Sequence, residues 1–157
     1  MTRVCILGKP DREVRYELLS RETARNALTT YDLDQPFANT LALDTVSLGA
    51  AVSLLNDLNW YLARFARAAF VREPSVSSTE WLSRELATRV RNNAIEPSES
   101  GEYLAVYGVA EGALAEPMYV RRRDAEADGS RREIPEYDLQ EVGTTLAVRV
   151  TEEEFGG

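Results

Sequence analysis

Two groups of residues in this sequence are of types that could do chemistry at a small site. Gly8-Lys9-Pro10-Asp11 stands between an apolar run and a candidate helix, and such a turn can hold a phosphate group. It matches neither a Walker A sequence nor a G-x-G-x-x-G loop, so Gly8 and Lys9 also fit an ordinary turn with Asp11 as a helix cap. Asp32 and Asp34 are the second group, because paired carboxylates can serve as general acid and base.

Other catalytic chemistries are excluded by composition. The chain has no histidine, which removes Ser–His–Asp and Cys–His nucleophiles, histidine bases and the common zinc sites. Cys5 is the only cysteine, so there is no intramolecular disulfide and no cysteine metal cluster. We predict no catalytic residue, no cofactor and no metal; a histidine-free carboxylate enzyme using Asp32 and Asp34 remains an alternative.

A third group is suited to binding a partner. Asn56, Trp60, Arg64 and Arg67 lie together on the polar face of a long helix predicted over 48–71, and Trp and Arg are the favoured anchors of interfaces. In the alternative interpretation, another part of the chain covers Trp60. The helix is predicted from apolar residues at steps of three or four: Leu48, Val52, Leu55, Leu58, Leu62, Phe65 and Ala69.

The remaining segments supply the elements that must position these groups. We expect strands at 2–7, 41–46 and 144–151, a hairpin at 102–122, and a helix from about 77 to 93 with Ser77 and Glu80 at capping-box spacing. Residues 11–31 read as one helix, or as a short strand followed by a helix capped at Ser20. Pro117 places the hairpin at an edge or a bulge. Residues 123–133 are predicted to be a mobile loop, and 134–142 irregular or a short helix.

The order β-α-β-α-α-β-β-β predicts an α/β (α+β) fold: a mixed sheet of about five strands covered by helices, with 48–71 as the long central helix. The strands at 2–7 and 144–151 should be central, because both are apolar and lack proline. We expect a single domain over 1–151 and an acidic tail over 152–157.

Charge and hydropathy indicate the setting. No apolar run is long enough to span a bilayer, and no signal peptide is visible, so we expect a cytoplasmic protein that does not bind membranes. There are 26 acidic and 18 basic residues, and Lys9 is the only lysine. Such an acidic, arginine-using chain is typical of proteins from halophilic archaea, because hydrated carboxylates keep a protein soluble at high salt. The same salt weakens nonspecific binding to nucleic acid, which we therefore do not expect as a partner.

The whole chain also resembles a small haloarchaeal family with no assigned function. The resemblance rests on Cys5-Ile6-Leu7-Gly8, on Val46-Ser47-Leu48-Gly49-Ala50-Ala51 with Leu58-Asn59-Trp60-Tyr61, and on Glu116-Pro117-Met118-Tyr119-Val120. It implies a halophilic, cytoplasmic setting but no activity, ligand or catalytic residue.

The sequence therefore favours a non-catalytic cytoplasmic interaction module with a protein partner, or a homodimer, working through Trp60 and its arginines. The alternative is a small-molecule or nucleotide-binding domain that uses the turn from Gly8 to Asp11.

Overall fold

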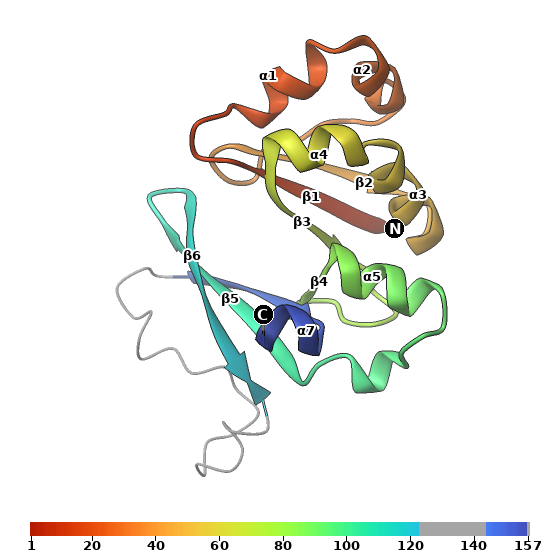
Figure 1. Ribbon diagram of the computed structural model, residues 1–157, viewed down its shortest axis with the longest axis vertical. Coiled ribbons are helices and arrows are strands. Elements are labelled where there is room, and N and C mark those ends of the chain that lie inside the picture. The colour runs from red at the N-terminus through yellow and green to blue at the C-terminus, as the bar shows by residue number, and fades with distance from the viewer. Residues whose placement is uncertain (123–143, 157) are drawn as a thin grey trace.

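The structure is a computed structural model that describes residues 1–122 and 144–156. Its described elements combine helices with a mixed sheet, so the predicted α/β (α+β) class is confirmed (Figure 1). In chain order they are β1 (Thr2–Gly8), α1 (Val14–Leu19), α2 (Glu22–Leu28), β2 (Thr40–Thr45), α3 (Leu48–Asp57), α4 (Asn59–Phe65), β3 (Ala66–Arg72), β4 (Trp81–Ser83), α5 (Arg84–Arg91), the 3-10 helix η1 (Pro97–Glu99), β5 (Tyr103–Ala110), β6 (Ala113–Arg121), β7 (Thr144–Val150) and α7 (Glu152–Gly156).

The strands form one mixed sheet in the order β2-β1-β3-β4-β7-β5-β6. Its two outer parts, β2-β1-β3 and β7-β5-β6, are antiparallel throughout. They are joined by β4, which has three residues and pairs antiparallel with β3 and parallel with β7. Figure 1 shows α1 to α4 beside the first part of the sheet, and α5 and α7 beside the second. The short β4 is therefore the junction between two halves of the molecule.

Two apolar clusters hold the sheet, one on each face. Alternation along β1 sends Val4 and Ile6 into the cluster under the helices, and Cys5 and Leu7 into the other. In the second cluster Phe70 of β3 meets Tyr107 of β5, with ring centroids 5.2 Å apart. These strands are three positions apart, which in a flat sheet is about 14 Å. The two halves of the sheet therefore turn toward each other on this face.

The prediction of one long helix over 48–71 is wrong in its second half. The chain forms α3, breaks at Leu58, forms α4 and then enters β3 at Ala66. The run from Ala66 to Val71 is apolar enough to continue a helical stripe, and a short apolar run cannot be assigned from periodicity alone. Pairing with β1 decides in favour of a strand, because it satisfies the backbone between two other strands.

Other boundaries also differ. The sheet has seven described strands rather than about five, because β3 and β4 lay within predicted helices. Residues 11–31 form two helices, and Glu13 rather than Asp11 caps the first.

Ser77 accepts from the backbone N–H of Glu80 as expected, but the bond closes a turn before β4. The helix begins later, capped by Ser83. The predicted acidic tail contains α7.

Several expectations are confirmed. β2 lies within one residue of its predicted bounds, and the β5–β6 hairpin forms one side of the sheet with Pro117 in the edge strand β6. β1 and β7 both lie inside the sheet. The segments predicted over 123–133 and 134–142 lie outside the described residues. No helix of the described chain is long and apolar enough to cross a membrane.

Candidate functional site: a cleft between the halves of the sheet

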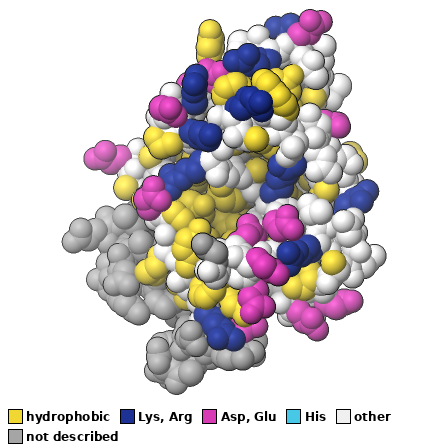
Figure 2. All heavy atoms as spheres, viewed as in Figure 1, with side chains coloured by type: hydrophobic (Ala, Val, Ile, Leu, Met, Phe, Trp, Pro, Cys, Tyr) yellow, Lys and Arg dark blue, Asp and Glu magenta, His cyan; other side chains and the backbone are white. Residues whose placement is uncertain are grey.

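A cleft opens where the two halves of the sheet separate. β3 pairs with β4 only through Phe70 and Val71, so its first residues diverge from β7 and β5. The space between them, which we call the central cleft, has a volume of about 640 Å³. In Figure 2 it is the hollow with a hydrophobic floor in the middle of the molecule, with basic side chains above it and acidic side chains below and to the right. A cleft of this size suits a small organic ligand.

The floor of the central cleft is apolar and built largely from small residues. Alanine at positions 66, 68 and 69 of β3 and 105 of β5 leaves the hollow open, where larger side chains would fill it. The larger apolar groups around them come from four elements: Leu62, Phe70, Tyr107, Val148 and Val150. Because Phe70 and Tyr107 belong to the second apolar cluster, the floor is part of the folded core and is held rigidly.

Arg84 brings a positive charge to the rim of this cleft. It is the first residue of α5, and its guanidinium donates to Asn56 Oδ1 near the end of α3 at 3.2 Å. Burial lowers the pKa of the guanidinium, and the neighbouring Glu85 offsets this only in part. Arginine stays charged at neutral pH even so. Among the described residues no carboxylate lies within 4.0 Å of it, since Glu85 pairs with Arg89 instead.

The other charged groups of the rim already have partners. Arg67, at the start of β3, forms an ion pair with Glu116 of β6. Glu154 of α7 accepts from Ser83 Oγ at 2.6 Å and from the backbone N–H of Thr151 at 2.9 Å. These contacts hold β6 on one side of the cleft and α7 on the other, and so they define its opening. Because these charged groups already have partners, they are less suited to bind a charged ligand.

Tyr107 adds a neutral polar group at the floor. Burial raises the pKa of its phenol to about 12, with smaller effects from Tyr119, Arg67, Glu116 and Glu154. The hydroxyl therefore keeps its proton at neutral pH and can donate a hydrogen bond.

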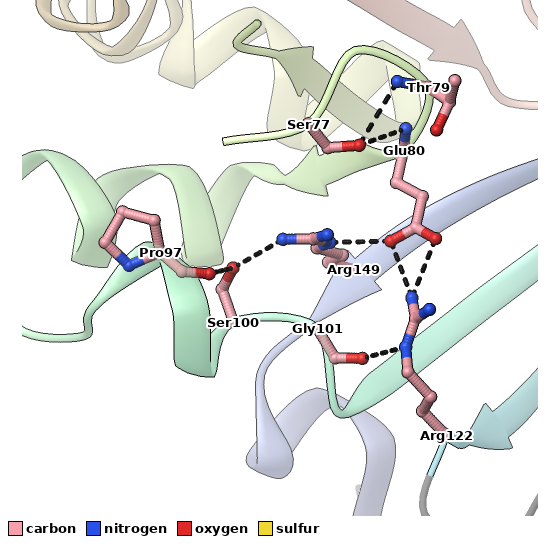
Figure 3. Close-up of polar contacts among 8 residues, drawn as sticks. All are labelled: Ser77, Thr79, Glu80, Pro97, Ser100, Gly101, Arg122 and Arg149. Carbon is pink, nitrogen blue, oxygen red and sulfur yellow. Dashed lines mark hydrogen bonds and ion pairs between the residues drawn. The ribbon is translucent and has the colours of Figure 1, made fainter. Parts of the chain in front are cut away.

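A second, larger groove of about 1020 Å³ runs beside η1, β5 and α7. Arg122 and Arg149 are among the residues that line it, and they converge on Glu80 (Figure 3). Arg122 donates to both Glu80 oxygens at 2.7 and 2.8 Å, and Arg149 donates to one at 2.7 Å and to Ser100 Oγ at 3.0 Å. Burial by itself raises the pKa of Glu80, but the hydrogen bonds from the two arginines outweigh it, so the pKa lies below its ordinary value.

This group of Glu80, Arg122 and Arg149, the Glu80 triad, is best explained as structural. Its carboxylate links β6 and β7 to the loop before β4, and Arg122 Nε also donates to the Gly101 carbonyl. Both arginines are thus committed to holding the second half of the sheet. The central cleft, with Arg84 at its rim, is the stronger candidate for ligand binding.

A family model matches residues 2–109, which run from β1 to β5. The chain belongs to DUF5804, a family of unknown function. This agrees with the expected membership of a family without an assigned activity. No match was found among curated proteins or among solved structures.

Some residues of the two sites lie inside the segment that the DUF5804 model matches, and others lie outside it. It includes Asn56, Arg67, Arg84 and Tyr107 of the central cleft, and Glu80 of the triad. It ends before Arg122, Arg149 and α7. The two arginines of the rim and most of the floor of the cleft are therefore within the matched segment.

The predicted patch of Asn56, Trp60, Arg64 and Arg67 is split between two places. Asn56 and Arg67 line the central cleft. Trp60 projects from α4 and is 52% exposed. Among the described residues, Arg64 stacks on its ring with the guanidinium 3.5 Å from the centroid, and Tyr61 lies edge-on at 5.1 Å. The described residues do not support the alternative that another part of the chain covers Trp60, because they leave about half of its surface in solvent.

The turn from Gly8 to Asp11 is filled by the side chain of Asn39. The Asn39 amide accepts from the backbone N–H of Val14 at 2.8 Å and donates to the carbonyls of Lys9 and Arg12. A Cβ at Gly8 would lie 2.6 Å from Asn39 Oδ1, which explains the glycine. The groups that would bind a phosphate are thus used by the protein itself, and we do not propose a ligand there.

Asp32 and Asp34 are both exposed, and Asp34 is paired with Arg3 at 2.8 Å. They lie beside β2 rather than in either cleft. Among the described residues no three His, Cys, Asp or Glu side chains are grouped to hold a metal ion.

Sequence reasoning missed Arg84. Nothing in its sequence neighbours distinguishes it from the other arginines of the chain. The distinguishing feature is its contact with Asn56, which only the packing of α3 against α5 creates.

Proposed function

We propose that this DUF5804 protein is a non-catalytic domain that binds a small organic molecule in the central cleft. The observation that carries the proposal is the combination of an apolar floor of about the right size with convergent polar groups on its rim, which is the usual composition of a ligand site. This keeps the small-molecule alternative from the sequence but moves it from the turn at Gly8 to the junction of the sheet.

The test is a screen of small organic molecules by NMR, with amide shifts recorded on the full chain. Hits should shift amides of β3, β5 and α5, and should be lost in Ala68→Leu, because Ala68 is partly exposed in the floor and a larger side chain there fills the hollow. Ala115→Leu is the matched control, since Ala115 is a partly buried strand residue outside the cleft. Binding that survives Ala68→Leu would refute the cleft as the site.

A second candidate function is favoured by Trp60. A half-exposed tryptophan stacked by Arg64, with Tyr61 edge-on at 5.1 Å, is the type of residue that anchors protein interfaces. Figure 2 shows hydrophobic and basic side chains side by side over α4 near the upper end of the molecule. We propose this surface for a protein partner or a second copy of the chain, as a function additional to the cleft.

The proposed setting is a salt-rich cytoplasm of a halophilic archaeon. It is supported by the net charge of −8 and by the single lysine among 18 basic residues. Salt dependence of the folded state, argued in the Discussion, tests this setting.

A further inference from the structure

We propose that the ligand of the central cleft is an amphipathic monoanion, a carboxylic acid with an aliphatic or aromatic body, whose carboxylate binds Arg84 and Asn56. This inference rests on the proposed function and specifies the class of molecule that the cleft accepts. It depends on the charges of the rim, on the donors at one end and on the shape of the floor.

The charged residues that line the central cleft favour a ligand with a single negative charge. Of the two arginines that line the cleft, Arg67 is neutralised by Glu116, whereas Arg84 has no carboxylate partner among the described residues. Glu85 and Glu154 also line the cleft. A ligand with one negative charge completes the pairing of Arg84, but a second negative charge would face these glutamates without a cation of its own.

The donors at Arg84 suit a carboxylate. Asn56 Oδ1 accepts from one guanidinium nitrogen, which fixes the orientation of a side chain that is otherwise flexible. The planar guanidinium matches the two oxygens of a carboxylate, and the Asn56 Nδ2 group supplies a further donor beside it. Because Arg84 is already partly desolvated, pairing it adds attraction at a small further cost of burial.

The floor accommodates an apolar body next to this head group. Phe70 and Tyr107 present aromatic rings, and Ala68 and Ala105 leave the space beside them open. An alkyl or phenyl group there would replace water on apolar surface, which is favourable by about 25 cal/mol per Å². A nucleotide fits poorly, because its phosphates carry several charges and the cleft offers one unpaired arginine.

The experiment uses 4-phenylbutyrate and octanoate as probes, titrated into the full chain by calorimetry at one fixed salt concentration. The neutral amide of each acid keeps the body and removes the charge. Arg84→Gln removes the cation, Ala68→Leu fills the floor, and Arg25→Gln, on exposed α2, is the matched control for loss of one arginine. The expected result is weaker binding by about tenfold or more for the amides and for Arg84→Gln, and unchanged binding for Arg25→Gln.

Three failures are distinguishable. If amides and acids bind equally, Arg84→Gln has no effect and Ala68→Leu abolishes binding, the cleft is the site but the anionic class is wrong. If Ala68→Leu leaves binding intact, the proposed function itself fails. Absence of binding by both acids at about 10 mM, in a protein that melts normally, overturns the inference on ligand class.

Discussion

The two tryptophans occupy opposite environments although both are paired with arginine. Trp81 of β4 is 5% exposed and belongs to the second apolar cluster, with Arg72 over its ring at 4.9 Å. Trp60 is 52% exposed and rests mainly on Arg64. Burial, rather than the stacked arginine, therefore decides what each contributes to stability.

We predict that Trp81→Ala lowers the free energy of unfolding by about 3–5 kcal/mol, because it leaves a cavity at the junction of the sheet. Trp60→Ala should lower it by less than about 1 kcal/mol, since exposed side chains contribute little. Urea denaturation measures both. A large loss in Trp60→Ala would mean that residues outside the described part cover this ring.

Association tests Trp60 separately. If its surface binds a second copy, light scattering at high salt should give a dimer for the wild type and a monomer for Trp60→Ala. A wild type that stays monomeric at all concentrations would rule out the second copy and leave a different protein as the partner.

The reactivity of Cys5 follows from its position in β1. Burial raises the pKa of its thiol to about 12, far above the pH of ordinary labelling. Because the thiolate is the reactive form, the folded protein should resist thiol reagents at pH 8 and react fully in denaturant. Rapid labelling of the folded protein would contradict the buried position of β1.

At the scale of elements, much of the fold was predictable and the exceptions share one cause. β1, β2, β7 and the β5–β6 hairpin were recognised because their apolar or alternating runs are bounded by turn residues. β3 was missed because Ala66 to Val71 continues the apolar stripe of α4, and the strand exists through its pairing with β1 and β4. The cleft was missed with it, since its opening is the divergence of β3 from β7.

The Glu80 triad should control the attachment of the hairpin. Glu80→Gln keeps the size of the side chain but removes the charge that balances Arg122 and Arg149, so we predict a loss on the order of 2 kcal/mol in unfolding free energy. Glu99→Gln, in exposed η1, is the control and should change little. Equal melting of both variants would contradict a structural role for the triad.

Glu80 should also make the stability of the folded protein depend on pH in a defined direction. The pKa of Glu80 is lowered in the folded protein, so its contribution to stability is present above the unfolded value near 4.5 and is lost as the pH falls through the lower folded value. Thermal melts across the acid range should therefore show a steeper loss in the wild type than in Glu80→Gln. A parallel loss in both would assign the acid sensitivity to other carboxylates.

At the scale of the whole molecule, charge dominates the behaviour in salt. The chain carries 26 acidic against 18 basic residues, and the excess repels itself in dilute buffer. We predict that the melting temperature rises as KCl increases from about 0.1 M to about 3 M, because salt screens this repulsion. A midpoint that is flat or falls over that range would remove the halophilic setting.

β7 lies between β4 and β5, although it follows both of them in the chain and is the last of the described strands. Until residues 144–150 have been synthesised, the edges of β4 and β5 that pair with β7 lack this partner strand. Exposed strand edges invite pairing with other chains, so a nascent chain stalled before Thr144 presents the surface that holdase chaperones protect. Completion of the sheet, and with it of the cleft, therefore requires β7 to enter between two strands that precede it in the chain.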